Sequence, residues 1–143
     1  MSDPFVDTDV IIRLLSGDDP QKQAEAAVLF EQVQAGKLKV AAPDTVIADA
    51  VYVLSSPRLY HLPRAQIEEL LRPLVALPSF RVKNKRVVLL ALRHYASSPI
   101  DFGDAMIVAT MQGADSSLLY SYDTDFDRFP TLTRRSPGAP TTG

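Results

Sequence analysis

Short apolar runs alternate along this chain with longer segments of helical periodicity, and that alternation restricts the fold more than any other feature. The runs occur at residues 5–6, 38–42, 80–82 and 117–122. The segments between them repeat apolar residues every three or four positions, which is typical of amphipathic helices. Strands that alternate with helices favour a parallel sheet packed between helical layers. The sequence therefore predicts an α/β fold.

Capping and helix-breaking residues indicate where the helices begin and end. Asp9 is a natural N-cap for the first helix, and Asp19-Pro20 is a typical start for the second. Pro73 lies inside the fourth helix, where we expect it to kink or split the helix. The helices are expected at residues 10–15, 20–36, 46–54, 63–77, 87–95 and 102–111.

Length and composition describe one globular domain. The chain has 143 residues, of which 46% are hydrophobic and 22% charged, and such a chain buries a sizeable core without cross-links. We place the domain at residues 1–135, because the stretch 136–143 is rich in Pro and Gly and is expected to be disordered. There is no cysteine, which excludes thiolate metal sites and thiol nucleophiles.

Targeting and charge patterns restrict the location and the partners. No apolar stretch approaches the roughly 18 residues of a membrane span, and no signal-peptide pattern opens the chain, so we expect a cytoplasmic protein. The formal net charge is −2 and becomes positive once four aspartates, Asp7, Asp49, Asp104 and Asp123, are set aside as candidates for an acidic site. An acidic pocket that binds a metal ion, carried on a mildly basic body, is compatible with a phosphate backbone. The basic residues within 81–86 either contribute to such phosphate binding or form a solvated loop, and the sequence favours neither reading.

Two of these aspartates, Asp7 and Asp123, directly follow predicted strands. Because the carboxyl ends of parallel strands meet at one edge of a sheet, we expect the two carboxylates to share that edge. Asp9 competes with Asp7 but is better explained as a helix cap. Asp125 and Asp127 compete with Asp123 but are more simply read as solvated or turn residues.

The other two aspartates lie within predicted helices. Asp49 is the sole charge in the run 46–54, and a buried carboxylate there requires a cation or a hydrogen-bonding network. Asp104 has two explanations that the sequence leaves open. It is either part of a site, or the third residue of a helix whose N-cap is Asp101, reaching back to that cap.

Taken together, Asp7, Asp49, Asp104 and Asp123 suit a divalent metal ion. Mg²⁺ and Mn²⁺ prefer oxygen ligands and keep several waters, so a protein supplies a few carboxylates. Such an ion also removes the repulsion among converging carboxylates. Histidine chemistry is not favoured, because His61 and His94 lie in dissimilar contexts that indicate surface or packing roles, and no glycine-rich phosphate loop is present.

Four motifs, in this order along the chain, resemble those of the PIN domain family, and most closely its VapC-type toxins. The motifs are Phe5-Val6-Asp7-Thr8-Asp9, Asp49 before Val51-Tyr52-Val53-Leu54, the stretch from Asp101 to Ala109, and Ser121-Tyr122-Asp123-Thr124-Asp125-Phe126. The resemblance covers about residues 4–132. It implies a three-layer α/β/α sandwich with a central, mostly parallel sheet.

The resemblance also implies an activity and partners. It predicts an endoribonuclease that depends on Mg²⁺ or Mn²⁺, forms a homodimer and is inhibited by a cognate antitoxin protein. Asp7 and Asp104 match the primary metal ligands, and Asp123 matches a further acid. Ser121 matches a hydroxyl residue two positions before that acid.

The chain departs from the family pattern at two positions. The second acid of the family is usually glutamate, whereas Asp49 is one methylene shorter and reaches about 1.5 Å less far. A bridging water would restore its contact; without one we expect reduced activity. Asp9 stands where the family often has asparagine, as a cap or a further metal contact.

Two other classes of function remain open from the sequence. One is a degenerate, non-catalytic domain that binds RNA or a protein partner, with Asp49 marking the lost activity. The other is a haloacid-dehalogenase-like phosphatase, which Asp7-Thr8-Asp9 after a strand would suit. That chemistry needs a supporting lysine after the middle motifs, and the chain has no lysine from Arg93 to its end.

Overall fold

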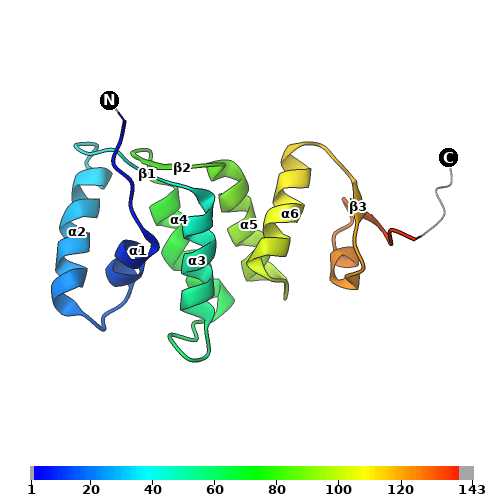
Figure 1. The fold of residues 1–143 in the computed structure, drawn as a ribbon, viewed down its shortest axis with the longest axis horizontal. Coiled ribbons are helices and arrows are strands. Elements are labelled where there is room, and N and C mark those ends of the chain that lie inside the picture. The colour runs from blue at the N-terminus through cyan, green and yellow to red at the C-terminus, as the bar shows by residue number, and fades with distance from the viewer. Residues whose placement is uncertain (1, 139–143) are drawn as a thin grey trace.

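The computed structural model describes residues 2–138, which form six helices and four short strands (Figure 1). The elements are α1 (Thr8–Leu15), α2 (Pro20–Gln34), β1 (Val40–Ala42), α3 (Asp44–Ser55), α4 (Arg64–Val75), β2 (Phe80–Val82), α5 (Lys85–Ser97), α6 (Phe102–Gly113), β3 (Leu118–Tyr120), the 3-10 helix η1 (Thr124–Arg128) and β4 (Thr133–Arg135). Helices and strands alternate along most of the chain, as predicted, and the α/β class is confirmed.

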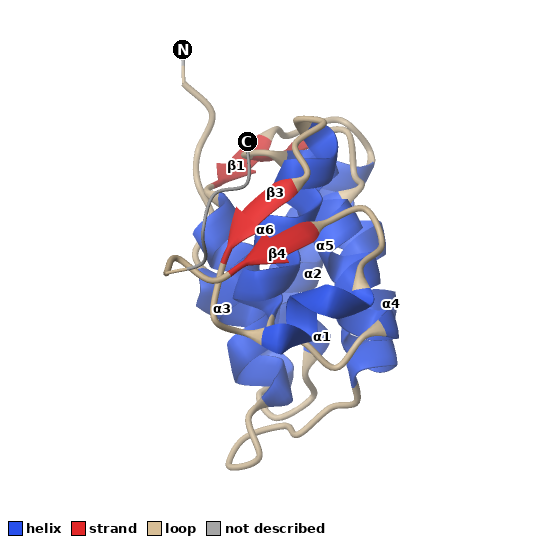
Figure 2. Cartoon of the chain, turned by 90° about the vertical axis from the view of Figure 1, so that its right-hand side faces the viewer, coloured by secondary structure: helices blue, strands red, loops and turns tan. Residues whose placement is uncertain are grey.

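The strands pair in parallel, but in two separate sheets (Figure 2). In the first sheet β1 pairs with β2, with Val40 opposite Phe80. In the second sheet β3 pairs with β4, with Leu118 opposite Thr133. The predicted strand at 5–6 contributes one isolated parallel bridge, from Phe5 to Ala41. The parallel pairing is as expected, whereas the central sheet is divided between the N-terminal and C-terminal parts of the described chain.

Apolar side chains from the helices and from the first sheet form one core. The largest fully buried side chains include Phe80, Ile11, Ile47, Leu54, Ile67, Leu71 and Leu92. Phe30 of α2 meets Phe80 of β2 edge-on, with ring centroids 5.6 Å apart, a geometry that aromatic pairs prefer. The core therefore joins the N-terminal helices to β2 and fixes the strand ends that lead into α3 and α5.

Pro73 lies within a single continuous α4, so the expectation that it splits the helix was wrong. It occupies the last turn, two residues before the helix ends at Val75. A proline removes one hydrogen bond to the preceding turn, and near the end of a helix little structure depends on that bond.

The C-terminal part, from β3 to β4, packs against α5 and α6 through aromatic residues of η1 and its flank. Phe126 and Phe129 are buried, and the Phe129 ring meets the His94 ring of α5 edge-on at 5.3 Å. The His94 ring also hydrogen-bonds to Gln112 of α6 (2.7 Å), which confirms the packing role predicted for His94. These contacts position the loop of Asp123 beside α6.

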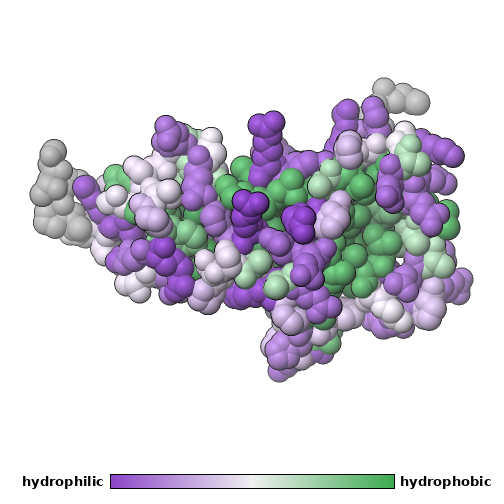
Figure 3. All heavy atoms as spheres, turned by 180° about the vertical axis from the view of Figure 1, so that it is seen from behind, coloured by the Kyte–Doolittle hydropathy of each residue, from purple (hydrophilic) through white to green (hydrophobic). Residues whose placement is uncertain are grey.

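The surface mixes polar and apolar residues. Seen from behind, hydrophilic residues cover much of the molecule, with hydrophobic ones visible between them (Figure 3). Phe5 is 69% exposed, beside its single bridge. None of the helices in residues 2–138 combines the length and apolar character that a membrane crossing requires. Most of the expected disordered tail, residues 139–143, lies outside the described residues.

Candidate acidic active site

Asp7 lies at the start of α1 and caps it. Its Oδ1 accepts a hydrogen bond from the backbone N–H of Thr8 (2.6 Å), and its backbone is extended. Asp9, which the sequence suggested as the cap, lies in the first helical turn instead. The helix begins two residues earlier than predicted, because the Asp7 side chain provides the capping oxygen. Asp7 nevertheless keeps an exposed carboxylate, with one oxygen that makes no hydrogen bond within residues 2–138.

Asp49 is exposed rather than buried, so the expectation of a buried charge was wrong. The inner face of α3 carries Val46, Ile47, Ala50, Val51 and Leu54. Asp49 lies on the other face, one turn before Tyr52, whose side chain is 76% exposed. No desolvation penalty applies to this carboxylate, which is free to contact a ligand from solvent.

Asp7 and Asp49 line one open pocket of about 530 Å³, between α1, α3 and the loop before α4. Asp9 and Arg13 line it as well. The packing of α1 against α3 brings the two predicted acids together. Two of the four predicted acids therefore line one pocket, together with the positively charged side chain of Arg13.

Arg13 is a residue of this pocket that the sequence did not single out. Its Nη1 lies 3.1 Å from Oδ1 of Asp18, and Asp18 also accepts hydrogen bonds from the hydroxyls of Tyr60 (2.6 Å) and Ser16 (2.7 Å). The Tyr60 hydrogen bond is the main reason that the pKa of Asp18 is lowered. The network ties the α1–α2 loop to the loop before α4. The spacing of Arg13 four residues after Asp9, on one helix face, was the available signal.

Asp104 lies in the first turn of α6, half-buried among other acids. Burial raises its pKa, and the neighbouring charges of Asp101, Asp123 and Asp125 raise it further. Asp101 is the N-cap residue of α6, but its side chain makes no capping hydrogen bond. Within residues 2–138 the Asp104 carboxylate also makes no hydrogen bond to the backbone N–H of Asp101, so the capping explanation is not supported.

Asp123 lies in the loop after β3 and is ordered by local hydrogen bonds. Its Oδ1 accepts from the backbone N–H of Asp125 (2.8 Å), while its own N–H donates to Oγ of Ser121 (3.0 Å). Asp127 is paired with Arg134 (2.8 Å), which lowers the pKa of Asp127. Asp127 is therefore engaged in an ion pair, rather than simply solvated as the sequence suggested.

The four aspartates thus fall into two pairs, which we name the α1–α3 pair (Asp7 and Asp49) and the α6–β3 pair (Asp104 and Asp123). Their oxygen donors are the type that Mg²⁺ and Mn²⁺ prefer. However, within residues 2–138 no three acidic or histidine side chains are grouped closely enough to hold a metal ion. The donor chemistry suits the ion, whereas the arrangement does not by itself form a complete site.

The described chain matches the PIN domain family over residues 5–132. It belongs to that family. The matched range contains both aspartate pairs and ends just before β4. No curated protein matches the chain closely enough to serve as a relative. PIN domains are generally nucleases and usually use divalent metal ions, so the acidic pairs lie in a chain whose family performs phosphodiester hydrolysis.

Proposed function

We propose that this protein is an endoribonuclease that depends on Mg²⁺ or Mn²⁺ and acts as the toxin of a toxin–antitoxin pair. The observation that carries the proposal is the placement of four aspartates on neighbouring elements of a PIN domain. Asp7 and Asp49 share a pocket, and Asp104 has its pKa raised in part by Asp123. Helix α3, which bears Asp49, contacts α6, which bears Asp104.

We assign roles to these residues from their positions. Asp7 and Asp104 are the proposed metal ligands, with Asp123 assisting them. Asp49 is exposed and short, so we assign it to orienting or deprotonating the attacking water, directly or through a second water. A divalent ion supplies charge neutralisation of the phosphate and lowers the pKa of a bound water. The product would carry a 5′-phosphate.

Cleavage of RNA by the purified protein tests the proposal. We expect cleavage with Mg²⁺ or Mn²⁺ that EDTA abolishes, and loss of cleavage in both Asp7→Asn and Asp104→Asn. Asp115→Asn is the matched control, because Asp115 is an exposed aspartate after α6 with a left-handed backbone (φ 54°) that asparagine also tolerates. Circular dichroism checks that all variants keep the fold. Full activity in either site variant would refute the assignment.

A non-catalytic RNA- or protein-binding domain is the second candidate. It is favoured by the lack of any grouping of three potential ligands within residues 2–138 and by the short side chain of Asp49. Calorimetric titration with Mn²⁺ separates the two candidates. If the site is active, wild type binds Mn²⁺ and the Asp7→Asn variant does not. If the site is degenerate, wild type and Asp7→Asn both bind Mn²⁺ weakly or not at all. The phosphatase alternative has no support from the family match, and we do not propose it.

The partners rest on the resemblance to VapC-type toxins. We propose a cognate antitoxin and a second copy of this chain, and we propose that the protein acts in the cytoplasm. The exposed Leu59, in the loop before α4, offers an apolar contact for the antitoxin. A small gene for a DNA-binding protein directly upstream would support the antitoxin, and light scattering would give the mass of the homodimer.

A further inference from the structure

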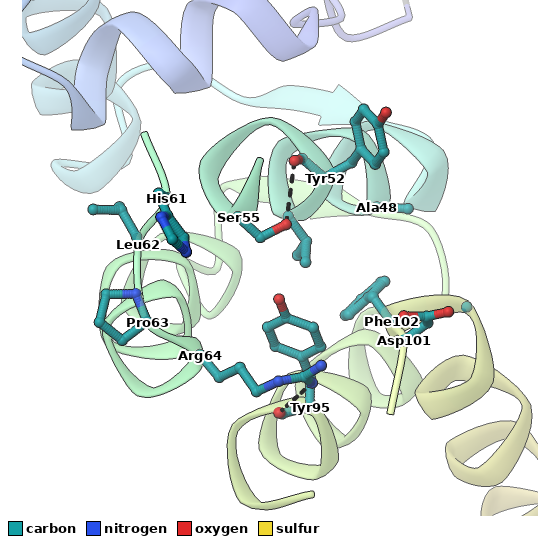
Figure 4. A pocket seen from close by; sticks show the side chains of 12 residues that line it. Ala48, Tyr52, Ser55, His61, Leu62, Pro63, Arg64, Tyr95, Asp101 and Phe102 are labelled. Carbon is teal, nitrogen blue, oxygen red and sulfur yellow. Dashed lines mark hydrogen bonds between the residues drawn. The ribbon is translucent and has the colours of Figure 1, made fainter. Parts of the chain in front are cut away.

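A second pocket, of about 850 Å³, opens between α3, α4, α5 and α6 (Figure 4). Tyr52 and Ala48 of α3 line one side, and Asp101 and Phe102 line another. Its volume falls in the range of small-molecule sites. We call it the four-helix pocket.

The four-helix pocket adjoins both aspartate pairs. Tyr52 lines this pocket and also the pocket of Asp7 and Asp49, so its side chain lies on the rim that the two share. On the other side, Gly103 lines the pocket and directly precedes Asp104. A strand of RNA with a phosphate near the aspartates would therefore pass the mouth of the four-helix pocket.

The Tyr95 hydroxyl points into this pocket and lacks a partner. The Tyr95 side chain comes from α5 and is only 5% exposed, and Figure 4 shows its hydroxyl directed at the open centre. Within residues 2–138 no atom hydrogen-bonds to this hydroxyl, which retains contact with the cavity. No buried side-chain oxygen of residues 2–138 lacks a partner, so this hydroxyl is open to water in the cavity, and a ligand there can take the place of that water.

The Tyr95 ring is held rigidly in place. The Arg64 guanidinium lies over it at 4.3 Å from the centroid, and Phe102 meets it edge-on at 6.2 Å. Arg64 is itself committed, because its Nη1 donates to the carbonyls of Tyr95, Ser98 and Ile100. The hydroxyl therefore projects from a fixed aromatic base and has little freedom to turn elsewhere.

The charges and shape of the pocket suit a nucleobase better than a phosphate. Asp101 lies at the edge and would repel a phosphate, while its oxygens can accept from an exocyclic amine. The Nη1 of Arg64 is occupied by the backbone carbonyls of Tyr95, Ser98 and Ile100, and its guanidinium stacks on the Tyr95 ring. The ring of Phe102, which points toward the open centre in Figure 4, provides an apolar wall for a flat ring. Unpaired RNA bases are recognised by such combinations of aromatic contact and polar edge contact.

We propose that the four-helix pocket binds one unpaired nucleobase of the RNA, with the Tyr95 hydroxyl hydrogen-bonded to the edge of the base. The inference rests on the proposed ribonuclease function and makes Tyr95 a specificity residue for it. The base next to the scissile phosphate enters the pocket past Tyr52. The enzyme consequently acts on single-stranded RNA, because a base within a duplex is not free to enter.

The test measures binding of a short fluorescein-labelled single-stranded RNA in EDTA, by fluorescence anisotropy, together with a set of RNAs that each lack one base. Tyr95→Phe removes one hydroxyl and nothing else, and we expect it to weaken binding of the intact RNA roughly 2- to 10-fold, the factor typical of one hydrogen bond. For the RNA that lacks the bound base, wild type and Tyr95→Phe should bind equally. Tyr120→Phe, at an exposed tyrosine of β3 outside the pocket lining, is the control and should leave binding unchanged.

The outcomes separate this inference from the proposed function. Equal binding of every RNA by wild type and Tyr95→Phe, with metal-dependent cleavage intact, would overturn the base pocket alone and would favour a protein ligand there. A base-dependent effect of Tyr95→Phe without any cleavage by wild type would support the pocket and overturn the nuclease. If wild type neither binds nor cleaves RNA, both the base pocket and the proposed nuclease function are overturned.

Discussion

At the scale of single residues, Asp104 shows how burial and neighbouring acids act on one carboxylate of the proposed site. Its carboxylate is half-buried, and burial, followed by the charges of Asp101, Asp123 and Asp125, raises its pKa. A cation that met these oxygens would relieve their repulsion. Without a bound cation, ionisation of Asp104 destabilises the folded state. Such clusters of like charges are common at functional sites.

The raised pKa of Asp104 predicts a pH dependence of stability. The folded chain holds this proton more tightly than the unfolded chain, whose pKa is near the ordinary value of 3.8. Stability from this group is therefore present at low pH and is lost as pH rises from about that value through the raised folded-state pKa. The Asp104→Asn variant does not lose stability in this way as pH rises, because an asparagine side chain does not titrate. In EDTA, urea unfolding from pH 3.5 to 7 should show wild type losing stability relative to Asp104→Asn as pH rises. A difference between the two proteins that stays constant over this range would contradict the account.

The sequence identified the candidate acids but not their surroundings. Asp7 and Asp123 were predicted to follow strands, and both lie in loops after short strand segments. The exposure of Asp49 was not predictable, because a mostly apolar helix does not reveal which narrow face remains in solvent. Arg13 and Tyr95 were missed for a related reason. Their importance depends on long-range contacts, with Tyr60 for the Asp18–Arg13 pair and with Arg64 for Tyr95.

At the scale of elements, Arg64 joins the start of α4 to the end of α5. Its Nη1 donates to the carbonyls of Tyr95 (3.1 Å), Ser98 (3.1 Å) and Ile100 (2.5 Å). The last carbonyls of a helix have no partner within the helix, and here one arginine serves them together with the loop that leads to α6. The position of Asp101 and Asp104 at the start of α6 depends on this link.

Arg64→Ala should therefore lower the free energy of unfolding by about 1.5–3 kcal/mol, the range for hydrogen bonds to a charged group. Arg72→Ala is the matched control on the same helix, because Arg72 is exposed and reaches Glu68 only at 3.8 Å. Its substitution should change stability by less than about 0.5 kcal/mol. Chemical denaturation measures both variants. Equal effects of the two substitutions would show that the Arg64 contacts do not hold the end of α5.

The helices were more predictable than the strands, for physical reasons. All six expected helices are present, because apolar residues at helical spacing, bounded by capping and helix-breaking residues, are a strong signal. β4 (Thr133–Arg135) was not predicted, since a run of Thr and Arg carries no apolar alternation. The division of the sheet was also beyond the sequence. Strand pairing depends on long-range contacts, and β3 has mostly exposed residues that do not specify a partner.

At the scale of the whole molecule, the protein places its aspartates on two parts of one PIN domain. The N-terminal part carries Asp7 and Asp49 in one pocket. The C-terminal part brings Asp123 to Asp104 through the packing of Phe126 and Phe129. Contact between α3 and α6 joins the two parts. We propose that both aspartate pairs serve one ribonuclease site.

Sequencing of RNA ends in cells that express the protein tests whether both aspartate pairs act in one site. Wild type and the control Asp115→Asn should generate new 5′-phosphate ends at the same discrete positions. Asp7→Asn, from the α1–α3 pair, and Asp123→Asn, from the α6–β3 pair, should both remove those ends while the proteins accumulate to equal levels. The same RNA ends in cells expressing wild type and Asp7→Asn would contradict the account.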